Sequence, residues 1–240
     1  MKRFSGIITL FAIIIGLCSC NISNGNDNDS ENKEASYMTT ALSKEGVDAF
    51  CDILGELQGE GLLSGYVCNR EKCFNVTPKW VTEETCCTIF KFSDSCASFV
   101  MIDNEIYPLC ESFGGYGFVN AVPYDFDNDG NKDLLVASSW GSGLHRSVIS
   151  IFNVSTKEST IIYDTSTTDN PQVDLFVSAQ TPSLSSSELS ELPIYYVVYS
   201  AEIKANDNNF ADLSYVATDY VGSISNEKGE IVFTPYENNK

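Results

Sequence analysis

The chain has 240 residues, with 14 Lys and Arg against 33 Asp and Glu, which gives a formal net charge of −19. So large an acidic excess excludes a protein that holds nucleic acid through its phosphates, because that binding needs clustered basic side chains. It favours cations, basic partners or simple solubility. Hydrophobic residues make up 43% of the chain, which is enough for a domain with a substantial core.

Residues 1–19 have the pattern of a signal peptide. Lys2 and Arg3 precede an apolar run at residues 6–17 that is too short for a comfortable membrane span. The sequence LCSC follows and resembles a bacterial lipobox. This resemblance implies cleavage before Cys20 and acylation, for example by palmitate, so that several acyl chains anchor the protein in a membrane. An ordinary secretory signal, with Cys20 as a structural thiol, is the alternative.

Residues 20–36 are predicted to be the lipidated cysteine and a flexible tether, since the segment is mostly Asn, Ser, Asp and Glu. Without Lys2 and Arg3, 12 basic residues face 33 acidic ones, a balance of −21. An aspartate after the lipid site commonly retains Gram-negative lipoproteins in the inner membrane, and Asn21 stands there instead. The nearby acids resemble surface-export signals of some Bacteroidetes lipoproteins. The expected location is therefore the bacterial cell envelope, at the periplasmic or surface face of the outer membrane.

A single globular domain is predicted for residues 37–240. Seven cysteines of this part all precede residue 111, namely Cys51, Cys68, Cys73, Cys86, Cys87, Cys96 and Cys110. In an extracytoplasmic protein this clustering indicates two or three disulfides. Spacing does not fix their connectivity. Reduced core thiols remain an alternative, and zinc is a weaker one because no histidine lies nearby.

Residues 37–110 are predicted to be a helical part. Apolar residues recur at helical spacing after Ser43, a candidate cap, and before Gly59: they are Val47, Phe50, Cys51, Leu54 and Leu57. A second helix is expected over residues 78–91, opened by Pro78.

The remaining pattern predicts strands. The candidates are residues 98–102, 117–124, 133–140, 147–153, 160–164, 173–179, 194–203, 212–224 and 230–236. Residues 225–229 predict a hairpin turn, and a short helix is expected before Pro193. The fold class is therefore α+β or mainly β, with short N-terminal helices followed by a mostly antiparallel β meander over residues 111–240.

One echo in the sequence raises an alternative fold. DLLVASS, DLFVSAQ and DLSYVAT begin at residues 133, 174 and 212, so their spacings of 41 and 38 are close to a propeller blade. A partial propeller-like sheet is therefore the alternative, although three copies would not close a propeller. Polar turns before unrelated strands are the other explanation.

The segment DFDNDGNKDLLV, residues 125–136, has the spacing of a calcium loop. Positions 1, 3, 5 and 9 are Asp125, Asp127, Asp129 and Asp133, and Asn131 can offer its carbonyl at position 7. Carboxylates this close repel one another unless a cation lies among them. These five residues are therefore the predicted calcium ligands, and an aspartate-rich turn without an ion is the alternative.

Position 12 of the loop excludes a true EF-hand. Val136 stands where an EF-hand has a bidentate glutamate, and a strand follows instead of a helix. The loop thus resembles the FG-GAP or VCBS calcium loop between two strands. Members of that class are usually blades of integrin-type propellers in cell-surface and secreted proteins, and here there is one full copy.

The next segment, WGSGLHRS, begins at Trp140. It resembles a W-G-S-G-[IL]-H-R-S segment that follows FG-GAP-like loops in uncharacterised bacterial lipoproteins and secreted proteins, a resemblance that implies no activity. Gly141 allows a tight connection, which favours a structural turn with His145 hydrogen-bonded to the loop and Arg146 paired with an aspartate. A ligand surface shared by Trp140, His145 and Arg146 is the alternative.

An enzyme is the less favoured interpretation. A pair of His145 with Ser142 or Ser147 lacks the nucleophile elbow, because Trp140 replaces its first glycine. Paired acids for glycoside cleavage cannot be located by sequence spacing. The sequence therefore assigns no catalytic residue.

The sequence favours a lipid-anchored envelope protein with a calcium-stabilised binding or structural domain. Its partner would be a protein or a glycan, and it would not bind nucleic acid. The alternatives are a secreted-type hydrolase acting on envelope or host polymers, and a subunit of an envelope complex.

Overall fold

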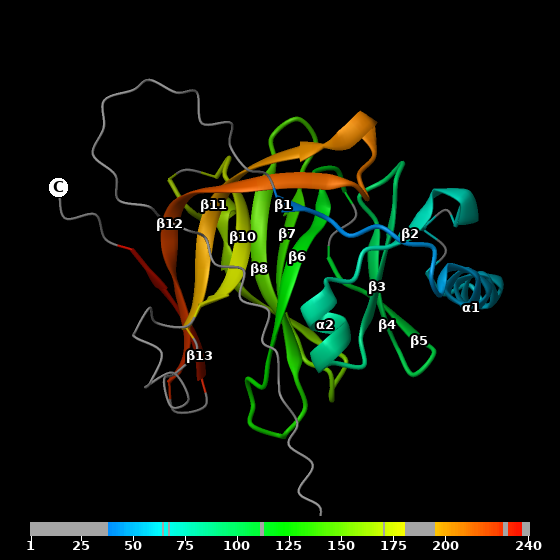
Figure 1. The fold of residues 1–240 in the computed structure, drawn as a ribbon, viewed down its shortest axis with the longest axis horizontal. Coiled ribbons are helices and arrows are strands. Elements are labelled where there is room, and N and C mark those ends of the chain that lie inside the picture. Colours follow the sequence, from blue (N-terminus) through cyan, green and yellow to red (C-terminus); the bar gives the residue numbers. More distant parts are fainter. Residues whose placement is uncertain are drawn as a thin grey trace, which may run out of the picture. The chain divides into compact units, whose positions relative to one another are not determined.

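The part of the chain described by the structure, a computed structural model, folds into three antiparallel sheets and two α-helices (Figure 1). It comprises residues 38–63, 65–66, 68–110, 113–169, 171–180, 195–227 and 230–236. The predicted signal peptide, Cys20, the tether and the helix expected before Pro193 lie outside the described residues. In the described part, no helix has the length and apolar character needed to cross a membrane.

The first sheet, called here the N-terminal sheet, carries α1 on its outer face. Its strands are β2 (Cys73–Asn75), β3 (Thr88–Phe92), β4 (Ser98–Ile102) and β5 (Glu105–Pro108), paired in chain order. Helix α1 (Val47–Gly59) buries its apolar stripe there, and the Phe50 ring stacks on Phe90 with centroids 4.3 Å apart. The N-cap is Gly46 at φ 74, without a side-chain cap, so the expected cap at Ser43 is wrong.

The central sheet is a four-stranded meander. Its strands are β6 (Gly117–Tyr124), β7 (Asp133–Trp140), β8 (Arg146–Phe152) and β9 (Ser159–Asp164). The C-terminal sheet contains β10 (Asp174–Gln180), β11 (Tyr195–Ala205), β12 (Leu213–Glu227) and β13 (Glu230–Pro235), and β1 (Met38–Thr39) also pairs with β12. The other elements are α2 (Lys79–Glu84) and the 3-10 turns η1 (Arg70–Lys72), η2 (Thr165–Thr167) and η3 (Asn206–Asn208).

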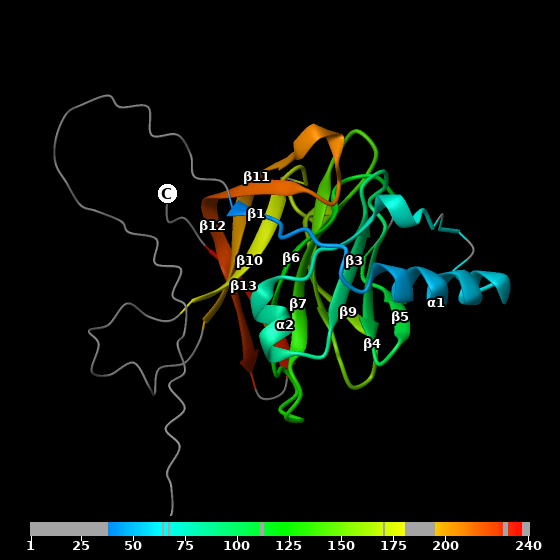
Figure 2. The same cartoon turned by 45° about the vertical axis from the view of Figure 1, so that its right-hand side comes forward.

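The three sheets stack face to face, with the central sheet covered on both sides (Figures 1 and 2). On one face, Leu134 and Val136 pack with residues of the N-terminal sheet such as Val100. On the other face, Leu135 and Ile149 pack with the C-terminal sheet. Seven consecutive residues of β7 are therefore buried, and the strand shows no alternation of apolar and polar side chains.

The mostly antiparallel β architecture is confirmed, and so are the strands predicted from residue 98 onward, with small shifts at their ends. The expectation that residues 37–110 are a helical part is wrong, because strands β2 to β5 lie within it. The second helix ends at Glu84, and residues 88–92 form β3 instead. Strand β3 is buried on both faces, so its short apolar run lacks the alternation that distinguishes a strand from a helix.

The repeat echo does not mark successive sheets. Its three copies fall at the starts of β7, β10 and β12. Strands β10 and β12 belong to one sheet, where they flank β11. The echo therefore reflects polar turns before strands, and it gives no support to a propeller-like repeat.

Six of the predicted disulfide cysteines are free thiols in this structure: Cys51, Cys68, Cys73, Cys86, Cys87 and Cys96. Cys51 and Cys73 are buried in the core beneath α1, and Cys68 packs against that core. Desolvation by burial, together with the neighbouring Cys51 thiol, raises the pKa of Cys68 to about 12. Burial also raises the pKa of Cys73, so Cys68 and Cys73 act as small apolar core members that stay protonated.

Candidate functional site

The connection between β6 and β7 gathers three aspartates. One oxygen from each of Asp125, Asp127 and Asp129 lies within 4.8 Å of the other two. Asn128, at φ 59, and Gly130, at φ 92, adopt the left-handed conformation that curls a loop tightly. This cluster could hold a metal ion, and the site contains oxygen ligands alone.

Asp125 gives the clearest sign that the loop is incomplete without a ligand. Its Oδ2 accepts a hydrogen bond from the backbone N–H of Gly130 at 3.1 Å. Its Oδ1 is buried and accepts no hydrogen bond from any described residue. A buried carboxylate oxygen without a donor is costly. A cation between the three carboxylates would supply the missing partner.

The turn between β8 and β9 donates hydrogen bonds to two aspartates of this cluster. Asn153 Nδ2 donates to Asp127 Oδ2 at 2.7 Å, and the Ser155 hydroxyl donates to Asp129 Oδ2. The hydrogen bond from Ser155, followed by those from Asn131, holds the pKa of Asp129 below its usual value. The neighbouring hairpin therefore orients Asp127 and Asp129, and it favours the ionised form of Asp129 that a cation needs.

Asp133 occupies a different place from the one that the loop spacing predicted. Asp133 is buried, and its two oxygens accept the backbone N–H groups of Phe126, at 3.3 Å, and Val154, at 2.9 Å. Burial raises the pKa of Asp133. Asn131 donates to Asp129 from its backbone at 2.7 Å and from its side chain at 3.2 Å. The three-aspartate cluster thus excludes Asp133, which ties the loop to the next hairpin.

Trp140, His145 and Arg146 do not share one surface. Trp140 and Arg146 are paired across β7 and β8, and the guanidinium carbon lies 5.2 Å from the Trp140 ring centroid. The His145 ring instead meets the edge of Tyr116, with centroids 4.7 Å apart, on the side of the C-terminal sheet. His145 directly precedes β8, and its ring contacts Tyr116, whereas Arg146 in the strand contacts Trp140.

The serine–histidine arrangement considered for hydrolysis is not formed. Ser147 is buried, and its hydroxyl accepts the backbone N–H of Leu175 at 3.2 Å. Ser142 is exposed. Among the described residues, no hydrogen bond joins either serine to His145. His145 lies instead near Asp174. Burial raises the pKa of Asp174, and the interaction with His145 offsets only part of that rise.

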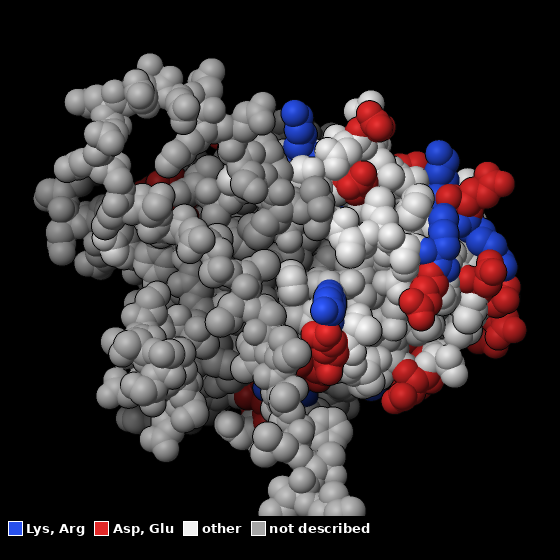
Figure 3. Space-filling view, in the orientation of Figure 1, with Lys and Arg blue, Asp and Glu red and all other residues white. Residues whose placement is uncertain are grey.

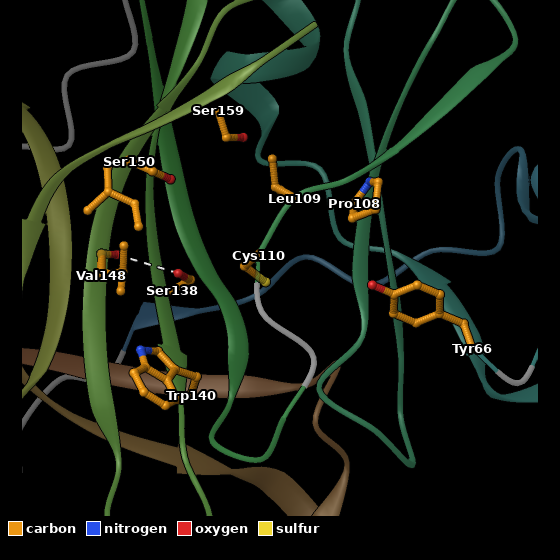
Figure 4. Close-up of a pocket in the computed structure, with 10 residues that line it drawn as sticks. Tyr66, Pro108, Leu109, Cys110, Ser138, Trp140, Val148, Ser150 and Ser159 are labelled. Atoms are coloured by element: carbon orange, nitrogen blue, oxygen red, sulfur yellow. Dashed lines mark hydrogen bonds between the residues drawn. The ribbon is translucent and has the colours of Figure 1, made fainter. Parts of the chain in front are cut away.

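A pocket that the sequence did not predict lies between the N-terminal and central sheets (Figure 4). Its volume is about 320 Å³, within the range of small-ligand sites. Trp140 lines it together with Tyr66, Leu109, Ser138, Ser150 and Ser159. Ser138 and Trp140 are two residues apart in β7 and therefore face the same side. Ser138 is a polar residue in a mostly apolar strand, and it was the sequence feature from which this pocket could have been predicted.

Basic and acidic side chains are interspersed over the described surface around α1 (Figure 3). Arg70 of η1 lies 3.0 Å from Asp48 and 2.6 Å from Asp52. These pairs are exposed, and such pairs contribute little to stability. The charges on this part of the surface compensate one another and form no continuous basic patch.

Comparisons with known proteins gave no match for this chain. No family model matches it, and searches of curated proteins and of solved structures gave no significant match. The functional interpretation therefore rests on the chemistry of the loop and the pocket.

Proposed function

We propose that the protein is a lipid-anchored binding or structural module of the bacterial cell envelope, stabilised by calcium in the loop between β6 and β7. The observation that carries the calcium part is the buried Asp125 Oδ1, which accepts no hydrogen bond from a described residue. It lies in a cluster with Asp127 and Asp129. Asp125, Asp127 and Asp129 would be the protein ligands, with water completing the coordination.

Calcium fits this cluster better than other common metal ions. The cluster offers carboxylate oxygens alone, which are hard ligands, whereas zinc and copper favour nitrogen or sulfur. A curled, partly exposed loop suits the irregular geometry of calcium, since magnesium demands near-ideal octahedral coordination. With three carboxylates, the affinity should match that of extracellular modules, with a Kd of about 0.1–1 mM.

Bound calcium would act on the stability of the central sheet. The ion would fix the loop after β6, and Asn153 and Ser155 connect that loop to the turn after β8. Both connections of the sheet at this end would then be held together. This arrangement supports a structural role for the ion, because the hydrogen bonds of the cluster connect two turns at the same end of the sheet.

The lipid anchor and the envelope location rest on the sequence. LCSC at residues 17–20 resembles a lipobox, and the polar segment after Cys20 has the composition of a tether. The partner of the anchored domain would be a protein or glycan of the envelope or its surroundings. The strongly acidic chain argues against a nucleic-acid partner.

A melting experiment tests the calcium site. The mature chain is unfolded by heat in EDTA and in about 10 mM calcium, a large excess over the expected Kd, which should raise the Tm by several degrees. Asp125→Asn should remove most of this shift, because it removes a ligand charge but keeps the shape. Asp103→Asn, at an exposed turn between β4 and β5, is the matched control and should retain the shift. An equal Tm in calcium and EDTA would refute the site.

A further inference from the structure

We propose that the pocket between the N-terminal and central sheets binds an acidic sugar, with Trp140 as the stacking platform and Arg146 as the partner of the sugar carboxylate. This site is separate from the calcium loop. Asp133, beside the loop, begins β7, and Trp140 ends it. The inference therefore goes beyond the proposed calcium-dependent function and can fail without it.

The pocket has two unlike walls. One comes from the ends of β7 and β8, with Trp140, Val148 and Ser150, and the other contains Tyr66 and Pro108 (Figure 4). Its volume of about 320 Å³ is at the lower end of small-ligand sites. A single sugar ring is of suitable size, whereas a folded protein segment is not.

Several polar groups of the pocket lack a partner. Ser150 is only 5% exposed, yet its hydroxyl makes no hydrogen bond to any described residue. Within the same described part, the indole N–H of Trp140 and the hydroxyl of Tyr66 also make none. These groups face the cavity and are therefore available to a ligand that enters it. A ligand rich in oxygen acceptors would satisfy these donors.

The charge of the pocket selects against a cationic ligand. The chain has 33 acidic residues, but none of the described residues that line the pocket is acidic. Arg146 is not a lining residue but lies beside one: it pairs with Trp140 across β7 and β8, and its guanidinium carbon is 5.2 Å from the Trp140 ring centroid. It forms no ion pair with any described residue. A guanidinium that stacks by its face keeps its edge N–H groups available for a carboxylate. The ligand should therefore carry a negative charge next to its ring.

A sugar explains the remaining groups better than an apolar acid. Ser138, Ser150 and Ser159 come from three adjacent strands and offer hydroxyls that can both donate and accept. Ser138 uses its own donor on the Val148 carbonyl, at 3.5 Å, and so has lone pairs for a ligand hydroxyl. An apolar acid would leave these hydroxyls unpaired in the complex, which is costly. The C–H face of a sugar ring can lie on Trp140.

Tryptophan fluorescence can test the proposal. The chain has two tryptophans, and Trp80→Phe leaves Trp140 as the only reporter. This variant is titrated with sodium glucuronate and with glucose, in calcium and in EDTA. Glucuronate should bind with a Kd on the order of 1 mM, a normal affinity for so small a ligand. Glucose, which lacks the carboxylate, should bind about 10-fold more weakly or not at all.

Two substitutions then separate charge from hydroxyl contacts. Arg146→Met should weaken glucuronate binding about 10-fold or more and leave glucose unaffected. Ser150→Ala should weaken the binding of both glucuronate and glucose, because both lose a hydrogen-bond partner. Arg70→Met is the matched control, since Arg70 is an exposed arginine paired with Asp48 and Asp52, and it should change neither. Unchanged Tm values establish that the variants are folded.

The outcomes are decisive even if a variant fails to fold. If the otherwise unmodified Trp80→Phe chain binds glucose and glucuronate equally well, the proposal that the ligand is acidic is refuted. If the fluorescence shows no saturable change up to about 20 mM glucuronate, the proposal of a sugar site is refuted. Glucuronate binding that survives Arg146→Met also refutes the assignment. Because the Asp125→Asn variant keeps the pocket, it should still bind glucuronate, which distinguishes failure of this site from failure of the calcium loop.

Discussion

At the residue scale, Lys91 is the least expected group of the core. This β3 lysine is 1% exposed, and its Nζ donates to the Phe118 carbonyl of β6 at 2.7 Å. Desolvation lowers its pKa to about 7, although the neighbouring Cys110 and Cys96 act in the opposite direction. The Lys91 amine therefore joins two sheets through a hydrogen bond, and in the folded protein it loses its proton near pH 7.

Lys91→Met should change the pH dependence of stability. Below about pH 7 the lysine is charged in both the folded and the unfolded chain, so the folded protein bears the full cost of burying a charged amine. Between pH 7 and about 10.4 the lysine is neutral in the folded chain but still protonated in the unfolded chain. The unfolded chain then binds one more proton than the folded one, so the free energy of unfolding rises with pH. The variant lacks this rise. Relative to wild type, its stability should fall by about 3 kcal/mol between pH 6 and pH 9.

Urea unfolding at the two pH values measures this difference. Lys79→Met is the control, because the Lys79 side chain is 83% exposed and its removal should leave the pH dependence unchanged. A Lys91→Met variant whose stability runs parallel to wild type at both pH values would show that the buried amine stays charged.

The sequence located most residues of the loop but not their separate roles. Alternating aspartates predicted a cation cluster, and Asp125, Asp127 and Asp129 do come together. Asp133 fitted the same spacing, but its oxygens accept backbone N–H groups from Phe126 and Val154. Spacing identifies acids near one another, whereas the fold decides which oxygens are already occupied. Lys91 gave no signal, since a lysine in a short apolar run reads as an exposed residue.

At the element scale, the start of β6 depends on a glycine. Gly117 has φ 65, and a Cβ there would lie 2.0 Å from the Cys96 carbonyl oxygen. That contact holds the central sheet against the connection before β4. Gly55, on the exposed side of α1, has no atom within 4 Å of an added Cβ.

Gly117→Ala and Gly55→Ala should therefore have opposite effects. The first should lower the free energy of unfolding by more than about 2 kcal/mol, through a strained φ and a clash with backbone. The second should raise it by about 0.5–1 kcal/mol, because alanine is the better helix former. Denaturant unfolding of both variants measures this, and equal effects would contradict the close approach of β6 to Cys96.

Elements with one strong local signal were predictable, and buried short ones were not. The apolar spacing that predicted a helix at Val47 corresponds to α1, and β6 and β7 have the predicted bounds. Strands β2, β3 and β5 were missed. Each is at most five residues long. So short a segment carries too few residues for a period of two to be distinguished from other patterns.

At the scale of the whole molecule, the order of the layers could not be predicted. The central sheet is covered by segments before and after it in the chain, and the pocket lies where two of these layers meet. Tyr66 and Trp140 approach the same cavity although 74 positions separate them in the sequence. Long-range packing of this kind leaves no mark in local spacing.

The proposed anchor gives a prediction for the intact protein. Expressed with its signal, the wild-type chain should partition into the detergent phase of a Triton X-114 extract and incorporate labelled palmitate, because acyl chains on Cys20 bury many methylene groups in a micelle. Cys20→Ser should abolish labelling, whereas it would retain the uncleaved apolar run at residues 6–17 and with it the affinity for detergent. Cys18→Ser, two residues earlier in the sequence, is the matched control. Palmitate labelling of the Cys20→Ser protein would exclude this anchor.

The pairing of β1 with β12 has a mechanical consequence. The first described strand is only two residues long, and Thr40, just after it, exchanges hydrogen bonds with Leu213 across 173 positions of sequence. A pull on the N-terminal end would load this short seam before it reached any other sheet. The seam can peel away while the three-layer core remains intact. A chain held at that end would thus have a weak link that yields first and protects the loop and the pocket from force.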